Sequence, residues 1–403
     1  MEVKYDIALI VLPDRISNNP EMYFPLGVAY LASVVRNAGY KVTVCDFRRD
    51  IGEIPKAIYY GFSCATPQIE EAKLLAKQLD GITIAGGAHP TLLPDDCINH
   101  FDYVVAGEGE SIILDILEGK VKNGLITTKR IEDLDTIPYP AWDMITKPFS
   151  DTLWPGERYG RGDLAGTLIG SRGCMFNCQF CGNLYRKPVI FRSVSDIIGE
   201  LESVMKFGVY HFRFEDDNFT EHPEYKLLCK EIKKLDIRYK CHTRSNLLTE
   251  DKARLLKESG CEECGLGVES ADDKVLRIVH KGEKAVHHGE AIRKLRQAGI
   301  RSKTYFMSGL PGETDNTLSL NMEFMQTYKP DKWTISTFSP YPGCGIFKHP
   351  EQFGIEIIEH DWRKWGNFCN DQYNHVLMGQ TPEEMWNRYK KMYAYYRSNK
   401  WQA

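Results

Sequence analysis

Three cysteines within eight residues are the group in this chain best suited to chemistry. Cys174, Cys178 and Cys181 have the spacing C-x3-C-x2-C, and the aromatic Phe180 directly precedes the last of them. Thiolates so close together can converge on one inorganic centre, and a cubane iron–sulfur cluster held by three of them would keep one iron open for a small molecule. The spacing alone also allows a structural zinc site or a chance group of thiols, although no matching second knuckle follows.

The second half of the chain contains the alternating strand and helix patterns that would position this cysteine loop. Strand-like apolar runs lie at residues 167–169, 209–215, 238–242, 263–269, 302–309 and 333–338. Helical patterns separate them at residues 194–205, 225–235, 252–259, 286–298 and 316–328. This α/β pattern predicts a partial (β/α)6 TIM-like barrel, whose site would lie at the carboxyl ends of the strands.

Polar residues gather at those predicted strand ends, as a binding site would require. They are Glu215, Asp216, Asp217, Arg244, Ser245, Glu269, Tyr305 and Tyr341, and the turn residues Gly309 and Pro311 lie at the same predicted end. The cysteine loop directly follows the first of these strands, so it would lie at the same end of the barrel. An acidic residue at a strand end can instead be a helix cap, so each carboxylate taken singly is also compatible with a structural role.

The first half of the chain predicts a doubly wound, Rossmann-like parallel sheet. Short β-branched runs lie at residues 6–12, 40–46, 57–62, 82–85 and 103–106, with helical patterns at 27–37, 68–79, 94–100 and 111–117. Ligands of such sheets bind at the carboxyl ends of the strands, where glycine lets the backbone approach them closely. The candidates at those ends are Leu26, Gly27, Ser63, Thr66, Gly86, Gly87, His89, Gly107, Glu108 and Gly109. Each glycine alone is a weak signal, because glycine is usual at any tight βα turn.

The length of the chain predicts two domains and an appendage. A chain of 403 residues exceeds one typical hydrophobic core. We expect the first domain at residues 1–125 and the barrel at 167–345, joined by a proline-rich linker at 126–166. A short aromatic helical segment at 346–403 is expected to pack on the barrel through one face.

Composition excludes several classes of protein. The chain is 42% hydrophobic and 26% charged with a net charge of −4, so it has no bulk attraction for nucleic acid or an anionic membrane. No apolar run approaches the roughly 20 residues that a membrane-spanning helix needs, and we expect a cytoplasmic protein without membrane insertion. Twelve cysteines are many for that compartment. Most are expected to pack as small hydrophobes, including the Cys261–Cys264 pair, for which a redox or ligand role is the alternative.

Taken together, these motifs resemble the cobalamin-dependent radical SAM family over residues 5–345. The barrel half combines the cysteine motif with Gly267-Val-Glu-Ser270 and Gly309-Leu-Pro-Gly-Glu313. In the first half, the series Pro25-Leu-Gly27, Gly86-Gly-Ala-His-Pro90 and Gly107-Glu-Gly-Glu110 is similar to the cobalamin-binding domain that precedes many radical SAM barrels. The resemblance implies the same two folds in the same order.

The resemblance also implies cofactors and residue roles for the barrel. Cys174, Cys178 and Cys181 would hold a [4Fe–4S] cluster whose open iron binds S-adenosylmethionine (SAM). Arg244 would bind the carboxylate of SAM and Glu269 its ribose hydroxyls. The other SAM-binding candidates are Phe180, Glu215, Asp216, Asp217, Ser245, Gly309 and Pro311, and Tyr305 and Tyr341 are candidate catalytic side chains. Reductive cleavage of SAM needs a low-potential electron donor, such as a flavodoxin or ferredoxin.

The first domain departs from the cobalamin pattern at one point. Many cobalamin domains carry Asp-x-His-x-x-Gly, whose histidine binds cobalt from below. The only histidines before residue 150 are His89 and His100, and neither lies in that motif. We therefore expect cobalamin to bind without a histidine ligand, with loss of cobalamin binding as the alternative.

By the resemblance, the protein would be a methyltransferase. It would methylate an unactivated carbon through a 5′-deoxyadenosyl radical and methylcobalamin, with a peptide or protein segment as one candidate substrate. A cobalamin-dependent radical SAM cyclase or rearrangement enzyme is the alternative. A methylthiotransferase is less favoured, because Cys45 and Cys64 do not lie where ligands of a second cluster would. A non-catalytic cobalamin or redox sensor would not need an intact SAM site. No nucleic acid partner is expected.

Overall fold

The computed structural model describes residues 3–13, 24–48, 51–146, 149, 164–366 and 373–398. Residues 150–163 of the predicted linker and 399–403 of the appendage lie outside these ranges. The chain divides into two compact units. Unit 1 comprises Met1–Thr152 and Asp361–Trp365, and unit 2 comprises Leu153–His360 and Gly366–Ala403.

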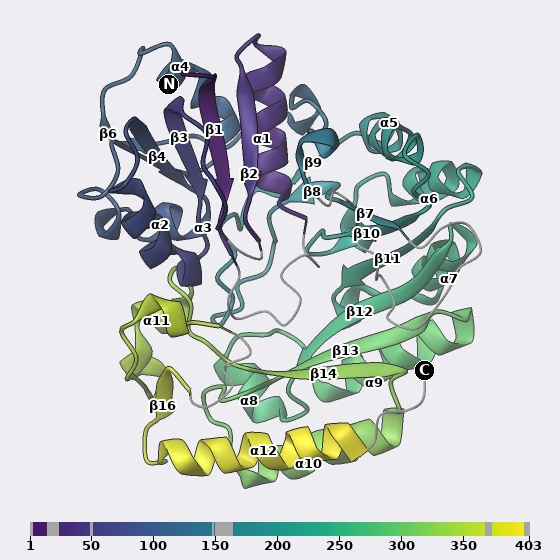
Figure 1. The fold of residues 1–403 in the computed structure, drawn as a ribbon. Coiled ribbons are helices and arrows are strands. Elements are labelled where there is room, and N and C mark those ends of the chain that lie inside the picture. The colour runs from purple at the N-terminus through teal and green to yellow at the C-terminus, as the bar shows by residue number, and fades with distance from the viewer. Residues whose placement is uncertain are drawn as a thin grey trace. The chain divides into compact units, whose positions relative to one another are not determined.

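Unit 1 contains a six-stranded parallel sheet with the order β2-β1-β3-β4-β5-β6 (Figure 1). Its strands are β1 (Tyr5–Val11), β2 (Val42–Asp46), β3 (Ala57–Ser63), β4 (Ile82–Gly86), β5 (Tyr103–Ala106) and β6 (Gly124–Thr127). Its helices are α1 (Leu26–Asn37), α2 (Ile69–Ala76), α3 (Ala88–Leu92) and α4 (Ile113–Leu117). The strand order reverses between β1 and its neighbours β2 and β3, which is where doubly wound sheets bind ligands.

Both faces of this sheet are buried, which explains the continuous apolar runs of its strands. Along β1, Ile7 and Leu9 join one core with Val28 and Val35 of α1. Ala8 and Ile10 join the opposite core, which includes Ile69 of α2. Successive side chains of a strand point to opposite faces, so a strand between two helical layers must be apolar throughout.

Two predicted elements of unit 1 differ from the structure. The strand β6 extends the sheet beyond the five strands expected from the sequence, because Gly124–Thr127 pairs with β5. The helix predicted at residues 94–100 is wrong: only a single 3₁₀ turn, Pro94–Asp96, forms there, and turns follow. So short a segment gains too few hydrogen bonds to offset helix nucleation.

Unit 2 contains a second parallel sheet of six strands, in the order β14-β13-β12-β11-β10-β7. Its strands are β7 (Ala165–Leu168), β10 (His211–Phe214), β11 (Arg238–Thr243), β12 (Cys261–Glu269), β13 (Arg301–Ser308) and β14 (Lys332–Thr337). Its helices are α5 (Val194–Met205), α6 (Tyr225–Lys234), α7 (Glu250–Glu258), α8 (Asp273–Ile278), α9 (Ala285–Ala298) and α10 (Asp315–Tyr328). A small hairpin pairs β8 (Ser171–Arg172) with β9 (Ile190–Phe191). These two sheets confirm the predicted fold class.

The two faces of the second sheet differ in burial. Along β13, Ser302, Thr304 and Phe306 are buried, whereas the intervening Lys303 and Tyr305 are half-buried. The helices of this unit lie along the outer, buried face (Figure 1). We call the other side the open face. It carries Arg213, Lys240, His242, Glu263, Lys303, Tyr305 and Lys332.

The predicted appendage packs on the barrel of unit 2, apart from the segment Asp361–Trp365. It forms α11 (Gly345–Lys348), the antiparallel pair β15 (Ile355–Ile357) and β16 (His375–Leu377), and α12 (Pro382–Ser398). Met385 and Met392 of α12 are buried, and the ring of Tyr396 lies 4.8 Å from that of Trp333 on β14. The aromatic stripe of α12 is therefore largely a packing surface, as its periodicity suggested.

Candidate active site

The cysteine loop follows β7 and is held in place by one arginine. The guanidinium of Arg186 donates hydrogen bonds to the carbonyl oxygens of Phe176, Cys178 and Cys181 at 3.1, 3.1 and 2.9 Å. The backbone N–H of Cys174 points at the carbonyls of Tyr185 and Arg186. One side chain thus collects three carbonyls that no regular secondary structure would satisfy, and this closes the loop around its thiols.

Polar groups from two other strand ends point at the sulfurs. The amide of Asn218, after β10, lies 3.5 Å from Cys174 Sγ. The guanidinium of Arg244, after β11, donates to Cys178 Sγ at 3.3 Å. Hydrogen bonds to ligating sulfurs are among the factors that set iron–sulfur potentials. The three cysteines are unpaired thiols, and this set of thiols and donors fits a cluster held from one side.

Burial disfavours the thiolate form of two of the three cysteines, Cys174 and Cys181. Burial raises the pKa of Cys174 and raises the pKa of Cys181 to about 11. A metal binds the thiolate and releases the proton, so cluster assembly here must displace protons.

The predicted acidic run after β10 separates into three different roles. Asp216 is buried and accepts hydrogen bonds from the Gly170 N–H and from Ser171 Oγ, so it fixes the strand that leads into the cysteine loop. Asp217 is exposed and bonds Asn183 Nδ2 at 2.6 Å. Glu215 pairs with Arg213 at 2.7 Å on the open face. Only Asp217 and Glu215 retain contact with solvent.

A buried cluster of four charges surrounds the ends of β11 and β12. Arg244 forms an ion pair with Glu283 at 3.1 Å and donates to the Lys281 carbonyl. Lys281 lies 3.3 Å from Glu269 and 3.6 Å from Glu283. Sequence reasoning found Arg244 and Glu269 but missed Lys281 and Glu283. These two lie in a loop between α8 and α9, and Lys-Gly-Glu between helices has the pattern of an ordinary surface turn.

Glu269 has the features expected of a residue that binds a ligand. It is buried, its Oε2 has no hydrogen-bond partner, and its φ is +62°, which is unusual for a residue other than glycine. A register shift of the sheet occurs at the same point, between Gly267 and Glu269. A buried carboxylate oxygen without a partner fits a hydroxyl donor such as a ribose, and backbone strain of this kind is found at functional sites.

The loop from Gly309 to Pro311, which contains two of the SAM-binding candidates, is held in place by Glu313. This buried carboxylate accepts from the N–H groups of Gly309 and Leu310 and from Ser308 Oγ. A Cβ on Gly309, whose φ is +93°, would lie 2.6 Å from the Tyr373 ring. Glycine is therefore required at position 309 because Tyr373 of the appendage packs against it. The hydroxyl of Ser245, another SAM-binding candidate, already has a hydrogen-bond partner within the chain: its Oγ lies 2.7 Å from His288 Nδ1.

The remaining aromatic candidates lie in different places. Tyr305 lies on the open face, where its ring centroid is 5.7 Å from that of His242 and the Lys303 ammonium is 5.1 Å from it. Tyr341 lies in the loop after β14, and its Cβ is the nearest atom to a Cβ placed on Gly182, directly after the cysteine motif. Phe180 lies under the ammonium of Lys281 at 5.8 Å.

In unit 1, the glycines at the strand ends have different structural reasons. Gly87 has a φ of +93°, and a Cβ there would lie 2.8 Å from the Cys64 nitrogen. Gly107 has a φ of +123°, and a Cβ there would overlap Thr128. The chain itself therefore requires both glycines. Gly27, at the start of α1, is exposed, and no atom of the described residues lies within 4 Å of a Cβ added there. Gly86 is nearly as open, so these two leave room for a ligand.

Two polar candidates of unit 1 are turned into the protein. His89 is completely buried, and its ring nitrogens lie 3.3 Å from Thr66 Oγ1 and 2.9 Å from Asp96 Oδ2. Glu108 is buried and accepts from the Ile131 N–H at 2.5 Å. The ring nitrogens of His89 are thus engaged within the chain. Leu26 and Ser63 are half-buried and Gly109 packs on Leu31.

His89, Asp96 and Cys97 bring potential metal ligands together but fit no metal. Their ligand atoms lie within 4.8 Å of one another. However, the ammonium of Lys73 already binds Asp96 at 2.7 Å, and burial raises the pKa of Cys97 to about 12. A cation in this place would compete with Lys73 for the carboxylate. The thiols of Cys261 and Cys264 are completely buried, as expected for packing residues.

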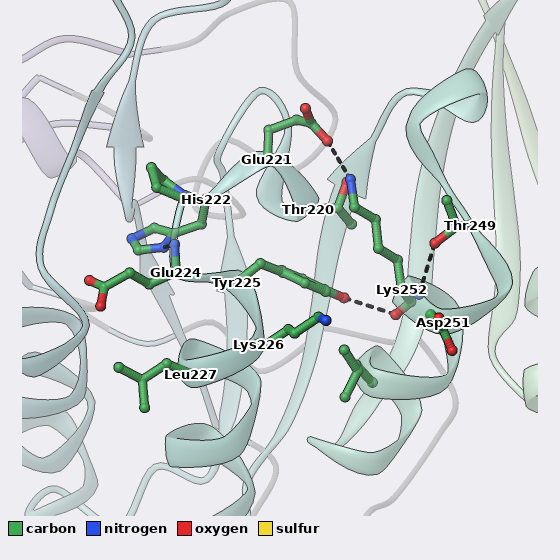
Figure 2. Close-up of a pocket in the computed structure, with 12 residues that line it drawn as sticks. Thr220, Glu221, His222, Glu224, Tyr225, Lys226, Leu227, Thr249, Asp251 and Lys252 are labelled. Atoms are coloured by element: carbon green, nitrogen blue, oxygen red, sulfur yellow. Dashed lines mark hydrogen bonds and ion pairs between the residues drawn. The ribbon is translucent and has the colours of Figure 1, made fainter.

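A cavity of about 620 Å³ lies elsewhere, between the turn Phe219–Glu221, α6 and α7 (Figure 2). Its polar groups bind one another: Lys252 pairs with Glu221 at 2.6 Å, and Tyr225 Oη donates to the Lys252 carbonyl. None of the cysteines or strand-end candidates lines it. We therefore place the active site at the strand ends and not in this cavity. Among the described residues, no helix combines the length and apolar character needed to cross a membrane.

Comparison with known proteins identifies both halves of the chain. The model of the radical SAM superfamily matches residues 168–325, and that of the B12 binding domain matches residues 17–117. An uncharacterized methyltransferase of Pyrococcus horikoshii is 27% identical over 383 residues, which covers 85% of this chain and 81% of the relative. An anaerobic magnesium-protoporphyrin IX monomethyl ester cyclase of Rubrivivax gelatinosus is 25% identical and covers 94% of this chain and 74% of the relative.

A solved structure shares the fold of nearly the whole chain. The radical SAM methyltransferase TsrM of Kitasatospora setae, with cobalamin and a [4Fe–4S] cluster bound, has a TM-score of 0.71 at 16% identity. The similarity covers 97% of this chain and 89% of that protein.

Proposed function

Because the chain belongs to the cobalamin-dependent radical SAM family, we propose that it methylates an unactivated carbon of its substrate. One observation carries the proposal: a B12-binding sheet precedes a barrel whose cysteine loop is closed by Arg186 and faced by the donors Asn218 and Arg244. The radical SAM domain implies a [4Fe–4S] cluster and SAM, and the B12-binding domain implies cobalamin. When bound, these cofactors supply the electron that splits SAM and the methyl group that is transferred.

We assign the following roles to the residues of the chain. Cys174, Cys178 and Cys181 ligate the cluster, and Arg186 orients their loop. The unpartnered oxygen of Glu269 accepts from a ribose hydroxyl of SAM. Arg244 lies between the cluster loop and Glu283, so it orients the sulfur of Cys178 and provides a cation near the carboxylate of SAM. These assignments follow from the contacts within unit 2.

A cyclase is the second candidate function. It is favoured by the Rubrivivax relative, which covers more of this chain than the Pyrococcus methyltransferase does. The two reactions differ in their products, because only methyl transfer converts a second SAM to S-adenosylhomocysteine. Product analysis therefore separates them.

The reaction needs an external reductant, for which we propose a flavodoxin or ferredoxin. The free thiols of the described residues fit a reducing compartment, so we propose a cytoplasmic location. The earlier candidate for the substrate, a peptide or protein segment, has no supporting feature among the residues that the structure describes. The charges of the open face instead favour a small anionic substrate.

The test is anaerobic reconstitution with iron, sulfide, hydroxocobalamin, SAM and a low-potential reductant. We expect 5′-deoxyadenosine and S-adenosylhomocysteine together, with a methylated product once the substrate is supplied. Deoxyadenosine without any homocysteine product would contradict methyl transfer and favour the cyclase. Cys178→Ala should abolish both products. Arg186→Met should lower the iron content, whereas Arg254→Met, on the exposed side of α7, should leave it unchanged.

A further inference from the structure

The open face of the second sheet is unusually polar for the inside of a βα barrel. Closed barrels fill their interior with packed, mostly branched apolar side chains. Here several inward positions of the sheet are half-buried and polar, including Lys240 and His242 on β11, Lys303 on β13 and Lys332 on β14. Long cationic side chains that stay half-buried on the inner face of a sheet indicate a surface that binds a ligand.

The strand register brings these cations together. Lys240 lies directly opposite Arg213 on one side and Glu263 on the other. Lys303 lies opposite Lys332, and on its other side opposite Gly265, which has no side chain. A Cβ on Gly265 would overlap the His242 ring, so the glycine keeps the centre of the open face unobstructed.

The carboxylates of this face do not neutralise all of its cations. Glu215 pairs with Arg213 at 2.7 Å, and Glu263 pairs with Lys332 at 3.1 Å. Lys240 and Lys303 have no hydrogen bond or ion pair with any residue in the described part of the chain. The Lys303 ammonium lies 5.1 Å from the centre of the Tyr305 ring. Two half-buried ammonium groups thus remain without an ion-pair partner among the described residues.

The pKa values of these groups agree with this geometry. Burial, together with repulsion from Arg213, lowers the pKa of Lys240 to about 7. Burial lowers the pKa of Lys303, although Glu263 acts against it and Arg213 adds to it. Burial lowers the pKa of His242 to about 4, so the imidazole is neutral and can donate or accept a hydrogen bond. A bound anion would relieve the repulsion and raise the pKa of both lysines.

We propose that the open face binds the substrate through its anionic groups, carboxylate or phosphate, held between Lys240 and Lys303. The inference rests on the proposed function, in which the substrate enters the barrel. The two lysines lie in the middle of their strands, and the cysteine loop and Glu269 lie at or after the carboxyl ends of strands. An anionic group held at mid-strand would therefore leave the rest of a small substrate pointing toward the reacting end.

Equilibrium dialysis on the full-length, cluster-reconstituted protein with saturating SAM and hydroxocobalamin tests the proposal. The probes are benzene-1,3,5-tricarboxylate and phenyl phosphate, with the neutral benzene-1,3,5-tricarboxamide as control. We expect an anionic probe to bind and the neutral one not to bind. The anion that binds more tightly identifies the head group. Lys240→Met and Lys303→Met should each weaken binding by about tenfold or more, as for a lost hydrogen bond to a charged group.

Matched controls separate this site from general charge effects. Lys230→Met removes one positive charge from the exposed side of α6 and should leave affinity unchanged. The anion should also raise the melting temperature of the wild type but not of Lys303→Met, which separates a binding defect from misfolding. Equal affinity in wild type and both open-face variants, equal loss in Lys230→Met, or displacement of the probe by SAM would each overturn the proposal. Dialysis measures anion binding and does not depend on methyl transfer. Failure of the proposed methyltransferase function would therefore appear in the product analysis and not in this measurement.

Discussion

The pKa of Lys240 shows how strongly the surroundings of one residue change its charge. On an exposed surface a lysine stays charged at neutral pH, because its ordinary pKa is about 10.4. Here the charged groups that face it are Arg213 on β10, Glu215 directly after that strand, Glu263 on β12 and Lys303 on β13. Burial is the main cause that lowers the pKa of Lys240, and repulsion from Arg213 and Lys303 adds to it.

The lowered pKa of Lys240 predicts that anion binding depends on pH. With a pKa of about 7, Lys240 is charged below pH 7 and loses its charge as the pH rises through 7. An anion binds the charged form better, so its affinity should be constant at low pH and fall by about tenfold between pH 6 and pH 8. Dialysis of benzene-1,3,5-tricarboxylate across this range measures the effect.

Two variants check the assignment of this pH dependence. Lys240→Met should bind weakly with no change between pH 6 and pH 8. Lys240→Arg should bind throughout the range, because an arginine stays charged. A wild-type affinity that does not change with pH would contradict the low pKa of Lys240.

At the scale of elements, the glycines of unit 1 fall into two groups: some are required by the fold, and others leave space for a ligand. All of them follow strands or begin helices and look alike in sequence. Gly87 packs against Cys64 and has a backbone conformation that side chains rarely adopt, whereas Gly27 faces open space at the start of α1. Within the described part of the chain, no contact requires glycine at position 27, and the open space there leaves room for a ligand.

Alanine substitutions should therefore give opposite results at these two positions. Gly27→Ala should leave the free energy of unfolding unchanged or raise it by about 0.5–1 kcal/mol, because the helix loses a flexible residue. It should nevertheless lower the amount of cobalamin retained after reconstitution, which the cobalt absorption bands report. Gly87→Ala should destabilise the protein by about 1–3 kcal/mol in denaturant. Normal cobalamin retention in Gly27→Ala would show that the ligand does not approach α1.

In unit 2, the loop after β13 is supported by residues from two different elements. Glu313, at the end of the Gly-Leu-Pro-Gly-Glu motif, turns inward and holds the loop, and His375 of the appendage bonds the Gly309 carbonyl at 2.8 Å. The appendage therefore helps to support the loop from Gly309 to Glu313 and is not an independent domain.

At the scale of the molecule, the chain enters unit 1 twice. After the barrel, the segment Asp361–Trp365 returns to unit 1. There the ring of Trp362 lies 5.3 Å from that of His89 and packs against the core beside α2. Trp365 is almost completely buried and its ring lies 4.9 Å from Trp362. Unit 1 is therefore incomplete without residues that follow the barrel in sequence.

This connection predicts that Trp362→Ala weakens unit 1. Hydrogen exchange should increase in α2 and around His89, because the aromatic cover of this core is lost, while β13 and β14 stay protected. The expected loss of stability is about 2–4 kcal/mol for a partly buried tryptophan. Trp386→Ala is the matched control, since Trp386 stacks on Tyr389 in α12 and should affect unit 2 alone. Uniform loss of protection in both units would contradict this division.

The sequence by itself was sufficient to predict the fold class, the order of the two halves and the cysteine loop. These features depend on spacing along the chain: the C-x3-C-x2-C motif is local, and buried parallel strands must be continuously apolar. The same reasoning predicted a helix at residues 94–100 that does not form and missed β6, because both are short and depend on neighbours for their stability.

Only the tertiary structure decided which candidates face a ligand. His89, Glu108 and Asp216 have the residue types of a site, but their partners Asp96, Ile131 and Gly170 turn them inward. Arg186, Lys281 and the open-face lysines had no signal in the sequence. Their roles depend on groups contributed by other elements and on which face of a strand is uncovered. Spacing along the chain is enough to recognise a local motif or a buried strand. The charge balance and burial of a side chain depend on residues that only folding brings together.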